Sequence, residues 1–427
     1  MTTPMTWRRR HLMGLLGAAA LPAWAQFRVV VTGVGLTQLP IGIVAFRGEP
    51  DAPQKVGAIV QADLERSGQF RSVASRTSVA LDETSRPDLG VWRAAGADSL
   101  LTGSVERTAD GRYDVRCRLW DVVRAQDLGG EKYSVTAGDL RLASHRIADF
   151  VYQKLTGERG IFSTRIAYVT QNASRFNLWV ADADGENAQS ALASSEPIIS
   201  PAWSASGGQL AYVSFESRKP VVYVHDVASG RRRLLANFRG SNSAPAWAPD
   251  GRTLAVTLSR EGGSQLYTID ANGGEPRRLL QSTAIDTEPV YAPDGRSIYF
   301  VSDRGGSPQV YRVGASGGTP ERVTFAGSYN ISPTISPDGR WLAFISRVQG
   351  QFKLHVMELP SGNAVPITDT IADESPSFSP NGRLIVYATR QNGREALMTA
   401  TVDGKIKARL AGQRGDIREP DWGPFQR

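Results

Sequence analysis

The sequence is poor in the residue types that most often build metal and catalytic sites. It has one cysteine, Cys117, and four histidines among 427 residues. One cysteine excludes an internal disulfide and a zinc site made of cysteines. Because Cys117 alternates with apolar residues between Tyr113 and Leu119, we expect a strand in which the thiol packs as a small buried hydrophobe. No histidine has a partner at the spacing of a metal site or a catalytic triad, which argues against both.

The sequence also lacks a strong excess of one charge and a long apolar run. The formal net charge is +7, and it falls to +4 without the three arginines at positions 8–10. No cluster of Lys and Arg is interleaved with aromatic residues, so nucleic-acid binding is not expected. The longest apolar run, near the N-terminus, has about 14 apolar or small residues, whereas a membrane-spanning helix needs about 20. We therefore expect a protein that is not embedded in a membrane.

Residues 1–25 have the three parts of a cleaved secretory signal peptide. The arginines at 8–10 precede an apolar run over 12–21, and Ala23-Trp24-Ala25 forms a cleavage site. The mature chain would then begin at Gln26, in the periplasm. The stretch around the arginines partly resembles a twin-arginine signal, so Sec and Tat export both remain open.

One short motif recurs through the last two-thirds of the chain. It reads Pro-x-aromatic or apolar-Ser/Ala-x-Asp/Asn/Ser-Gly, and its copies are 43 or 44 residues apart. Its prolines are Pro201, Pro245, Pro289, Pro333, Pro376 and Pro420. Each unit also contains three further short apolar or alternating segments, and pairs such as Asp250-Gly251 supply the positive φ of tight hairpins. Four short strands per unit of this length are typical of a β-propeller blade.

The phase of the repeat predicts how the propeller closes. The first unit begins at its second strand, at Ile166, whereas a last Pro-x-Trp element stands alone at Pro420. The two fragments make a sixth full unit if the C-terminal strand pairs into the first blade. An open solenoid explains this phase poorly and leaves an exposed edge. We therefore predict a mainly β fold, with a closed six-bladed propeller over residues 164–427.

Residues 26–157 lack the repeat and predict a small α/β domain. We expect strands over 27–31 and 40–46, a helix over 56–67, a hairpin from 99–105 and 113–123, and a helix over 140–155 that Gly157 ends. Residues 158–163 form a short linker, so the two domains are expected to touch.

An enzymatic function is not expected. Gly314-Ala-Ser316-Gly-Gly318 matches a nucleophile elbow, which needs a strand before it and a helix after it. The repeat instead places Ser316 in an outer hairpin turn. His145 falls on the last helix of the N-terminal domain, and His225 and His355 fall on third strands of blades three apart. We expect no required cofactor.

Carboxylates are frequent in the loops that enter the inner strands. They are Glu196, Asp286, Glu288, Asp373, Glu374 and Glu419. Inner strands line the central channel of a propeller, so these loops should converge at one mouth. They are either ordinary solvated side chains or a polar funnel that holds a ligand, including a cation such as calcium. The loops between second and third strands open on the same face, and their polar, glycine-rich sequences favour an extended peptide or a partner domain.

The chain without its signal peptide resembles the TolB family, the periplasmic β-propeller proteins of the Tol-Pal cell-envelope system. The resemblance is carried by segments 40–44, 154–157, 164–169, 210–217 and 308–311. Ser-Pro-Asp-Gly repeats occur in many propellers, so the matches in the N-terminal domain and at the junction are what make it specific.

The resemblance implies a monomeric protein that binds other proteins and catalyses nothing. Family members bind the peptidoglycan-associated lipoprotein Pal at the propeller mouth, where bacteriocins mimic Pal. Their first mature residues contact the inner-membrane protein TolA, and this segment is thought to change order when Pal binds. The implied role is to support outer-membrane integrity and the invagination of that membrane at cell division, together with other envelope proteins.

Two groups of residues match the family's contact segments. The Pal-contacting loops match Ser241, Asn242, Ser243, Ala244, Thr287 and Glu288, and Ser241 stands where some relatives have a histidine. The TolA-contacting segment matches residues 26–34, which begin with Gln26, Phe27, Arg28, Val29, Val30 and Val31. A propeller that binds a small molecule, a sugar or a cation at its channel mouth remains the alternative.

Overall fold

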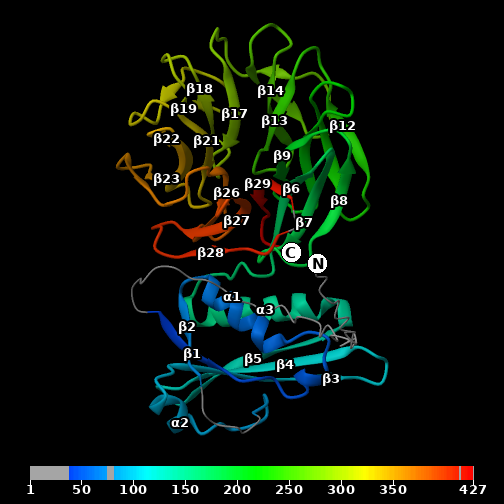
Figure 1. Cartoon of the computed structure of the whole chain (residues 1–427), viewed down its shortest axis with the longest axis vertical. Helices are drawn as coiled ribbons and strands as arrows, with labels where there is room; N and C mark the ends of the chain where they lie inside the picture. The colour runs from blue at the N-terminus through cyan, green and yellow to red at the C-terminus, as the bar shows by residue number, and fades with distance from the viewer. Residues whose placement is uncertain (1–37, 75–80, 413–414, 427) are drawn as a thin grey trace, which may run out of the picture.

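The computed structural model describes residues 38–74, 81–412 and 415–426. The expected signal peptide, the strand expected over 27–31 and the whole TolA-contacting segment lie outside these residues. Figure 1 shows a helix-and-sheet domain at one end of the molecule and a ring of sheets at the other. This is the mainly β architecture, with a propeller behind an α/β domain, that the sequence predicts. Within the described residues, no helix has the length and apolar character needed to cross a bilayer.

The N-terminal domain is a five-stranded sheet in the order β2-β1-β3-β4-β5. Its strands are β1 Leu39–Ile43, β2 Phe70–Ser72, β3 Ser99–Arg107, β4 Tyr113–Asp121 and β5 Gln126–Val135. Its helices are α1 Val56–Arg66, α2 Leu89–Ala94 and α3 Leu140–Thr156, with short 3-10 turns at Glu49–Asp51 and Ala137–Asp139. Figure 1 shows α1 and α3 between this sheet and the propeller, and α2 beyond the opposite side of the sheet.

The expected helices form where apolar spacing and end signals agree. In α3, Ile147 and Val151 face the core, and the helix ends at Gly157, whose φ of 77° only glycine adopts easily. The strand expected over 40–46 is shorter, because after Ile43 the chain leaves the sheet and packs Phe46 against Gly103. Strand β5 was not expected, because it is a partly exposed edge strand with two glycines and no apolar alternation.

The propeller has six blades of four antiparallel strands each. Blade one is β29 Asp416–Trp422, β6 Arg165–Asn172, β7 Arg175–Asp182 and β8 Gln189–Ser194; blade two is β9 Ile198–Trp203, β10 Gln209–Ser214, β11 Val221–Asp226 and β12 Arg232–Ala236. Blade three is β13 Asn242–Trp247, β14 Thr253–Leu258, β15 Gln265–Asp270 and β16 Arg277–Arg278; blade four is β17 Asp286–Tyr291, β18 Ser297–Ser302, β19 Gln309–Gly314 and β20 Glu321–Arg322. Blade five is β21 Asn330–Ile335, β22 Trp341–Val348, β23 Gln351–Glu358 and β24 Asn363–Pro366; blade six is β25 Glu374–Phe378, β26 Leu384–Gln391, β27 Arg394–Thr401 and β28 Lys407–Arg409.

The ring is closed by the C-terminal strand, as the phase of the repeat predicts. Strand β29 pairs antiparallel with β6, which places Trp422 opposite Ile166 and completes blade one. Strand β29 also packs against β25 of blade six and β9 of blade two. The apolar core is continuous from the N-terminal domain through Ile161 and Phe162 into blades one and six. Ile161 and Phe162 of the short linker are therefore buried, and the two domains are in direct contact.

Candidate functional site

The inner strand of every blade bulges at the residue before its recurrent proline. These residues have φ between 47° and 53°, and they are Ser200, Ala244, Glu288, Ser332, Ser375 and Glu419. A left-handed conformation costs a residue other than glycine about 1–2 kcal/mol, and such strain is concentrated at functional sites. All six line a central cavity of about 550 Å³. The repeat thus places one strained residue from each blade around the same channel.

Two of these residues are glutamates on opposite sides of the ring. Glu288 in blade four accepts a hydrogen bond from the backbone N–H of Ser332 in blade five, at 2.6 Å. Glu419 in blade one accepts the equivalent bond from Ser200 in blade two. Burial raises the pKa of both carboxyl groups, and the nearby charge of Glu288 adds to the effect on Glu419. Each glutamate therefore joins neighbouring blades and also places a carboxyl group in the channel.

A third channel carboxylate, Glu374, has an unsatisfied oxygen. Its Oε1 atom is buried and has no hydrogen-bond partner. Burial raises the pKa of Glu374 to about 7, against the opposing charge of Arg418 and with help from Glu419. Arg418 also lines the cavity, and its guanidinium pairs with Asp416 at 2.6 Å. This part of the channel therefore changes its charge near neutral pH.

Asp286 and Asp373, expected at the mouth, are enclosed within the propeller wall. They are 0% and 2% exposed. Asp286 pairs with Arg304 at 2.7 Å, and Asp373 accepts a 2.6 Å hydrogen bond from the Thr389 hydroxyl. Each stands three residues before the recurrent proline, as does the buried Asn242. These side chains hold the mouth loops in place and do not face the channel. Glu196, by contrast, is exposed in the loop before β9.

The residues that match the Pal-contacting loops lie at the start of two neighbouring inner strands. Ser243, Ala244 and Thr287 are half-buried on β13 and β17. The Asn242 side chain is fully buried and bonds the backbone of the preceding loop, accepting from the Phe238 N–H at 2.8 Å. Asn242 is thus placed to shape this loop rather than to contact a partner directly.

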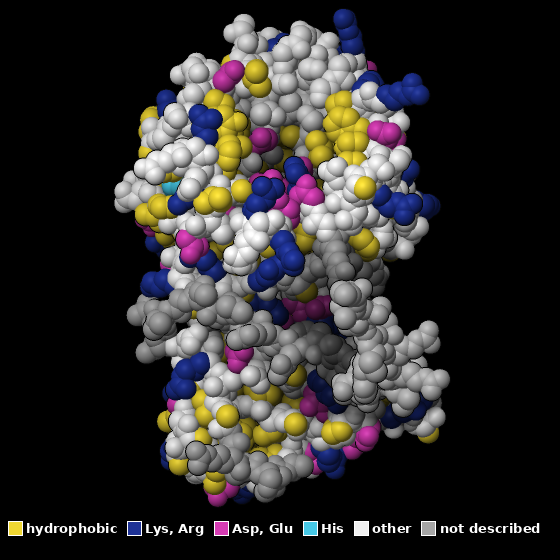
Figure 2. Space-filling model, in the orientation of Figure 1, with side chains coloured by type: hydrophobic (Ala, Val, Ile, Leu, Met, Phe, Trp, Pro, Cys, Tyr) yellow, Lys and Arg dark blue, Asp and Glu magenta, His cyan; other side chains and the backbone are white. Residues whose placement is uncertain are grey.

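Sequence reasoning missed three exposed apolar side chains in loops that lead into inner strands. Ile285, Phe325 and Ile371 are 53%, 71% and 52% exposed, in the loops that lead into the inner strands of blades four, five and six. Figure 2 shows charged side chains gathered at the hollow in the middle of the propeller disc, with apolar side chains around it. The sequence does not single them out, because these loops also contain apolar residues that are buried, such as Leu279 and Ile367. A polar hollow with apolar side chains at its edge is suited to a protein partner.

The residues considered as catalytic candidates lie in a turn or are buried within strands. Ser316 lies in the turn after β19, and no helix follows it. Cys117 is 3% exposed, and burial raises the pKa of its thiol to about 12, so it packs as a small hydrophobe. His225 and His355 lie within β11 and β23, and burial lowers the pKa of each.

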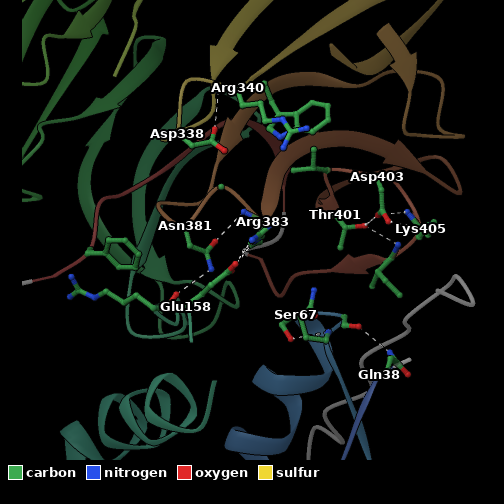
Figure 3. A pocket seen from close by; sticks show the side chains of 18 residues that line it. Gln38, Ser67, Glu158, Asp338, Arg340, Asn381, Arg383, Thr401, Asp403 and Lys405 are labelled. Atoms are coloured by element: carbon green, nitrogen blue, oxygen red, sulfur yellow. Dashed lines mark hydrogen bonds and ion pairs between the residues drawn. The ribbon is translucent and has the colours of Figure 1, made fainter. Parts of the chain in front are cut away.

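A second concave site lies between the two domains. This groove has a volume of about 920 Å³ and is lined by Gln38 and Ser67 from the N-terminal domain and by residues of blades five and six. Figure 3 shows these two residues facing propeller side chains that include Arg383 and Lys405. Glu158 of the linker forms an ion pair with Arg383 across one end of the groove. Gln38, the first residue that the structure describes, thus lines the groove itself.

Known proteins match the chain along nearly its whole length. A TolB amino-terminal domain model matches residues 27–128, and a TolB beta propeller domain model matches residues 152–426. The Tol-Pal system protein TolB of Polaromonas sp. (strain JS666) is 76% identical over 98% of both chains, and that of Dechloromonas aromatica is 61% identical over 98% of both. The crystal structure of TolB from Acinetobacter baumannii is similar with a TM-score of 0.84 at 38% identity, covering 93% of this chain and 99% of that one. The chain belongs to the TolB family.

Proposed function

We propose that this protein is a periplasmic, monomeric adaptor of the Tol-Pal system. It binds Pal at the propeller mouth and TolA through residues 26–34, and so connects the outer membrane to the inner-membrane complex. In this role it supports outer-membrane integrity and the invagination of that membrane at division, and bacteriocins exploit the Pal contact. The proposal rests on family membership and on one observation above all, the charged hollow of the propeller with apolar side chains around it (Figure 2).

In this proposal, the exposed apolar loop residues and the polar hollow supply different parts of a protein interface. Ile285, Phe325 and Ile371 provide apolar surface that a partner would remove from water. Ser243 and Thr287, lower in the mouth, provide hydroxyl groups for an extended segment of the partner. A pull-down from a periplasmic extract tests this function, with co-purified Pal as the expected result. If no Pal is retained, the small-ligand alternative is favoured.

Substitution at the mouth should weaken Pal binding without unfolding the ring. We expect the double variant Thr287→Ala, Glu288→Gln to bind Pal about tenfold more weakly or worse, since buried interface contacts dominate affinity. Glutamine keeps an oxygen that can accept the bond from Ser332, so blades four and five stay joined. Isothermal titration calorimetry gives the affinity, and Ser316→Ala, in an outer turn of the same blade, is the matched control. Equal affinities for the double variant and the control would contradict the proposed Pal site.

We also propose that a cation such as calcium binds in the channel and adjusts this site. The buried, unpartnered Oε1 of Glu374 is the observation that favours it. Among the residues that the structure describes, no three channel carboxylates come within 4.8 Å of one another. Calcium accepts six to eight oxygen ligands, waters among them, so one or two carboxylates with water would suffice.

Calcium affinity should therefore depend on pH. The pKa of Glu374 is about 7, so its carboxyl group is mostly protonated at about pH 6 and mostly ionised at about pH 8. We expect affinity to rise about tenfold between these two values, in proportion to the ionised fraction. Glu374→Gln should abolish the rise, whereas Glu196→Gln, on an exposed loop, should preserve it. Calorimetry that detects no calcium binding at the higher pH would rule the cation out.

A further inference from the structure

Six charged side chains are buried together where the N-terminal domain meets blade one. They are Asp63 and Arg66 from α1, Arg141 and His145 from α3, and Asp182 and Asp184 from the end of β7 and the turn after it. Five of these side chains are at most 9% exposed, and Asp182 is 18% exposed. We call this set the interdomain ion cluster. The spacing of residues along the chain does not indicate this cluster, because its three segments are far apart in sequence.

Contacts within the cluster cross between the domains. The Nδ1 atom of His145 lies 2.6 Å from Oδ2 of Asp63, and its Nε2 atom lies 3.6 Å from Oδ2 of Asp182. Arg141 donates from Nε to Asp182 at 3.0 Å and also pairs with Asp184. The histidine therefore stands between a carboxylate of its own domain and one of the propeller.

Arg66 completes the set from α1. It donates to Asp63 at 2.9 Å, and its second terminal nitrogen lies 3.9 Å from Asp184. Each propeller carboxylate of the cluster thus meets at least one cation of the N-terminal domain. A further contact between α3 and the linker is made by Asp149, which accepts a hydrogen bond from the Phe162 N–H at 2.7 Å.

The charges of the cluster balance only when His145 is protonated. Three carboxylates face two guanidinium groups, which leaves one negative charge that is costly to bury unpaired. Burial alone would lower the pKa of His145, but the charge of Asp63, with Asp182 and Asp184, raises it to about 10. The Nδ1–H of an imidazolium ion can donate to Asp63, and its positive charge faces Asp182 across 3.6 Å, an ion-pair distance that is too long for a hydrogen bond.

We propose that His145 is an ionic latch between the domains, whose imidazolium neutralises the interdomain ion cluster and so holds the N-terminal domain on blade one. With His145 neutral, the cluster carries a net negative charge, and the contacts to Asp182 and Asp184 weaken. The N-terminal domain is then held less firmly against the turn after β7.

A metal ion is the competing explanation for the same residues. Ligand atoms of Asp63, His145 and Asp184 lie within 4.8 Å of one another, which is the spacing of a metal site. However, Arg66 and Arg141 already pair with these carboxylates, and the Nδ1 atom of His145 already bonds Asp63, so a divalent cation would have to displace these contacts. The geometry therefore favours the ionic latch.

Nuclear magnetic resonance of the imidazole nitrogens tests the latch in the unmodified protein. We expect both nitrogens of His145 to carry protons at about pH 8, unlike those of His225, whose pKa is lowered by burial. A neutral His145 at this pH would overturn the proposal. This measurement needs no variant, so it decides the question even if substitution of His145 prevents folding.

The pH dependence of the folding equilibrium gives a second test of the latch. Since the folded pKa of about 10 exceeds the ordinary value of 6.5, the stabilisation is complete below about pH 6.5 and is lost as pH rises towards 10. We expect the folding equilibrium constant to fall by up to about tenfold per pH unit in this window. His145→Gln should remove this slope and speed hydrogen exchange in α3 and at residues 182–186, whereas His225→Gln should keep the slope. An unchanged slope in His145→Gln, or Co²⁺ binding that His145→Gln abolishes, would overturn the proposal.

Discussion

Deleting residues 26–34 is expected to abolish TolA binding and to leave Pal binding intact or tighter. Gln38, which follows the segment in the sequence, lines the groove between the domains, whereas the proposed Pal site lies at the propeller mouth. A terminal segment is held by few contacts, so its docking free energy can be small. A partner that competes for its docking surface, or changes that surface, would then shift the population of docked and free segments.

A finer version of this experiment compares the two faces of the segment by substitution. In an extended strand, Phe27, Val29 and Val31 lie on one face, and Arg28 and Val30 lie on the other. If the apolar face makes the contact, changing its three residues to serine should reproduce the deletion, while Arg28→Ser with Val30→Ser should retain more of the affinity. Calorimetric titration with TolA measures both, and equal melting temperatures establish that the fold is intact. Unchanged TolA affinity after the deletion would refute the assignment of the segment.

Removing the Trp422 side chain is expected to cost the propeller about 3–5 kcal/mol of unfolding free energy, the usual loss for a large buried aromatic residue. Trp422 is 6% exposed in the closing strand, and its indole N–H donates to the Thr164 hydroxyl at 2.9 Å. Its backbone N–H donates to the Ser377 hydroxyl of blade six at 3.0 Å. The residue thus joins both ends of the ring and the neighbouring blade.

Chemical denaturation of Trp422→Ala measures this loss. The control is Trp341→Ala, because Trp341 is half-buried at the groove and is not part of the closure. Truncation before β29 should have a still larger effect, since it removes a whole inner strand and exposes the edge of β6. A truncated chain that unfolds at the same denaturant concentration as the intact one would show that closure does not stabilise the ring.

The channel glutamates show why the site was only partly predictable. Glu288 and Glu419 could be placed near the channel because the repeat locates the inner strands. Their bonds to Ser332 and Ser200 could not be predicted, because those bonds depend on how neighbouring blades pack. Asp286 and Asp373 come from similar sequence positions near the inner strands, yet they turn into the wall, where Arg304 and Thr389 satisfy them. The two glutamates stand directly before the recurrent proline and the two aspartates stand three residues before it, so the sequence separates the two groups. Only the packing of the blades shows that the first position faces the channel and the second turns into the wall.

The amino-acid sequence by itself determined the blade, the number of blades and the place where the ring closes. These follow from local physics, namely the alternation of apolar residues, the glycine turns and the phase of a repeat. The tertiary structure alone decided which carboxylates face the channel and which apolar loop residues are exposed. It also decided that His145 meets Asp63 and Asp182. Those features depend on contacts between residues far apart in the chain, where burial and neighbouring charge set the chemistry and no spacing in the sequence records it.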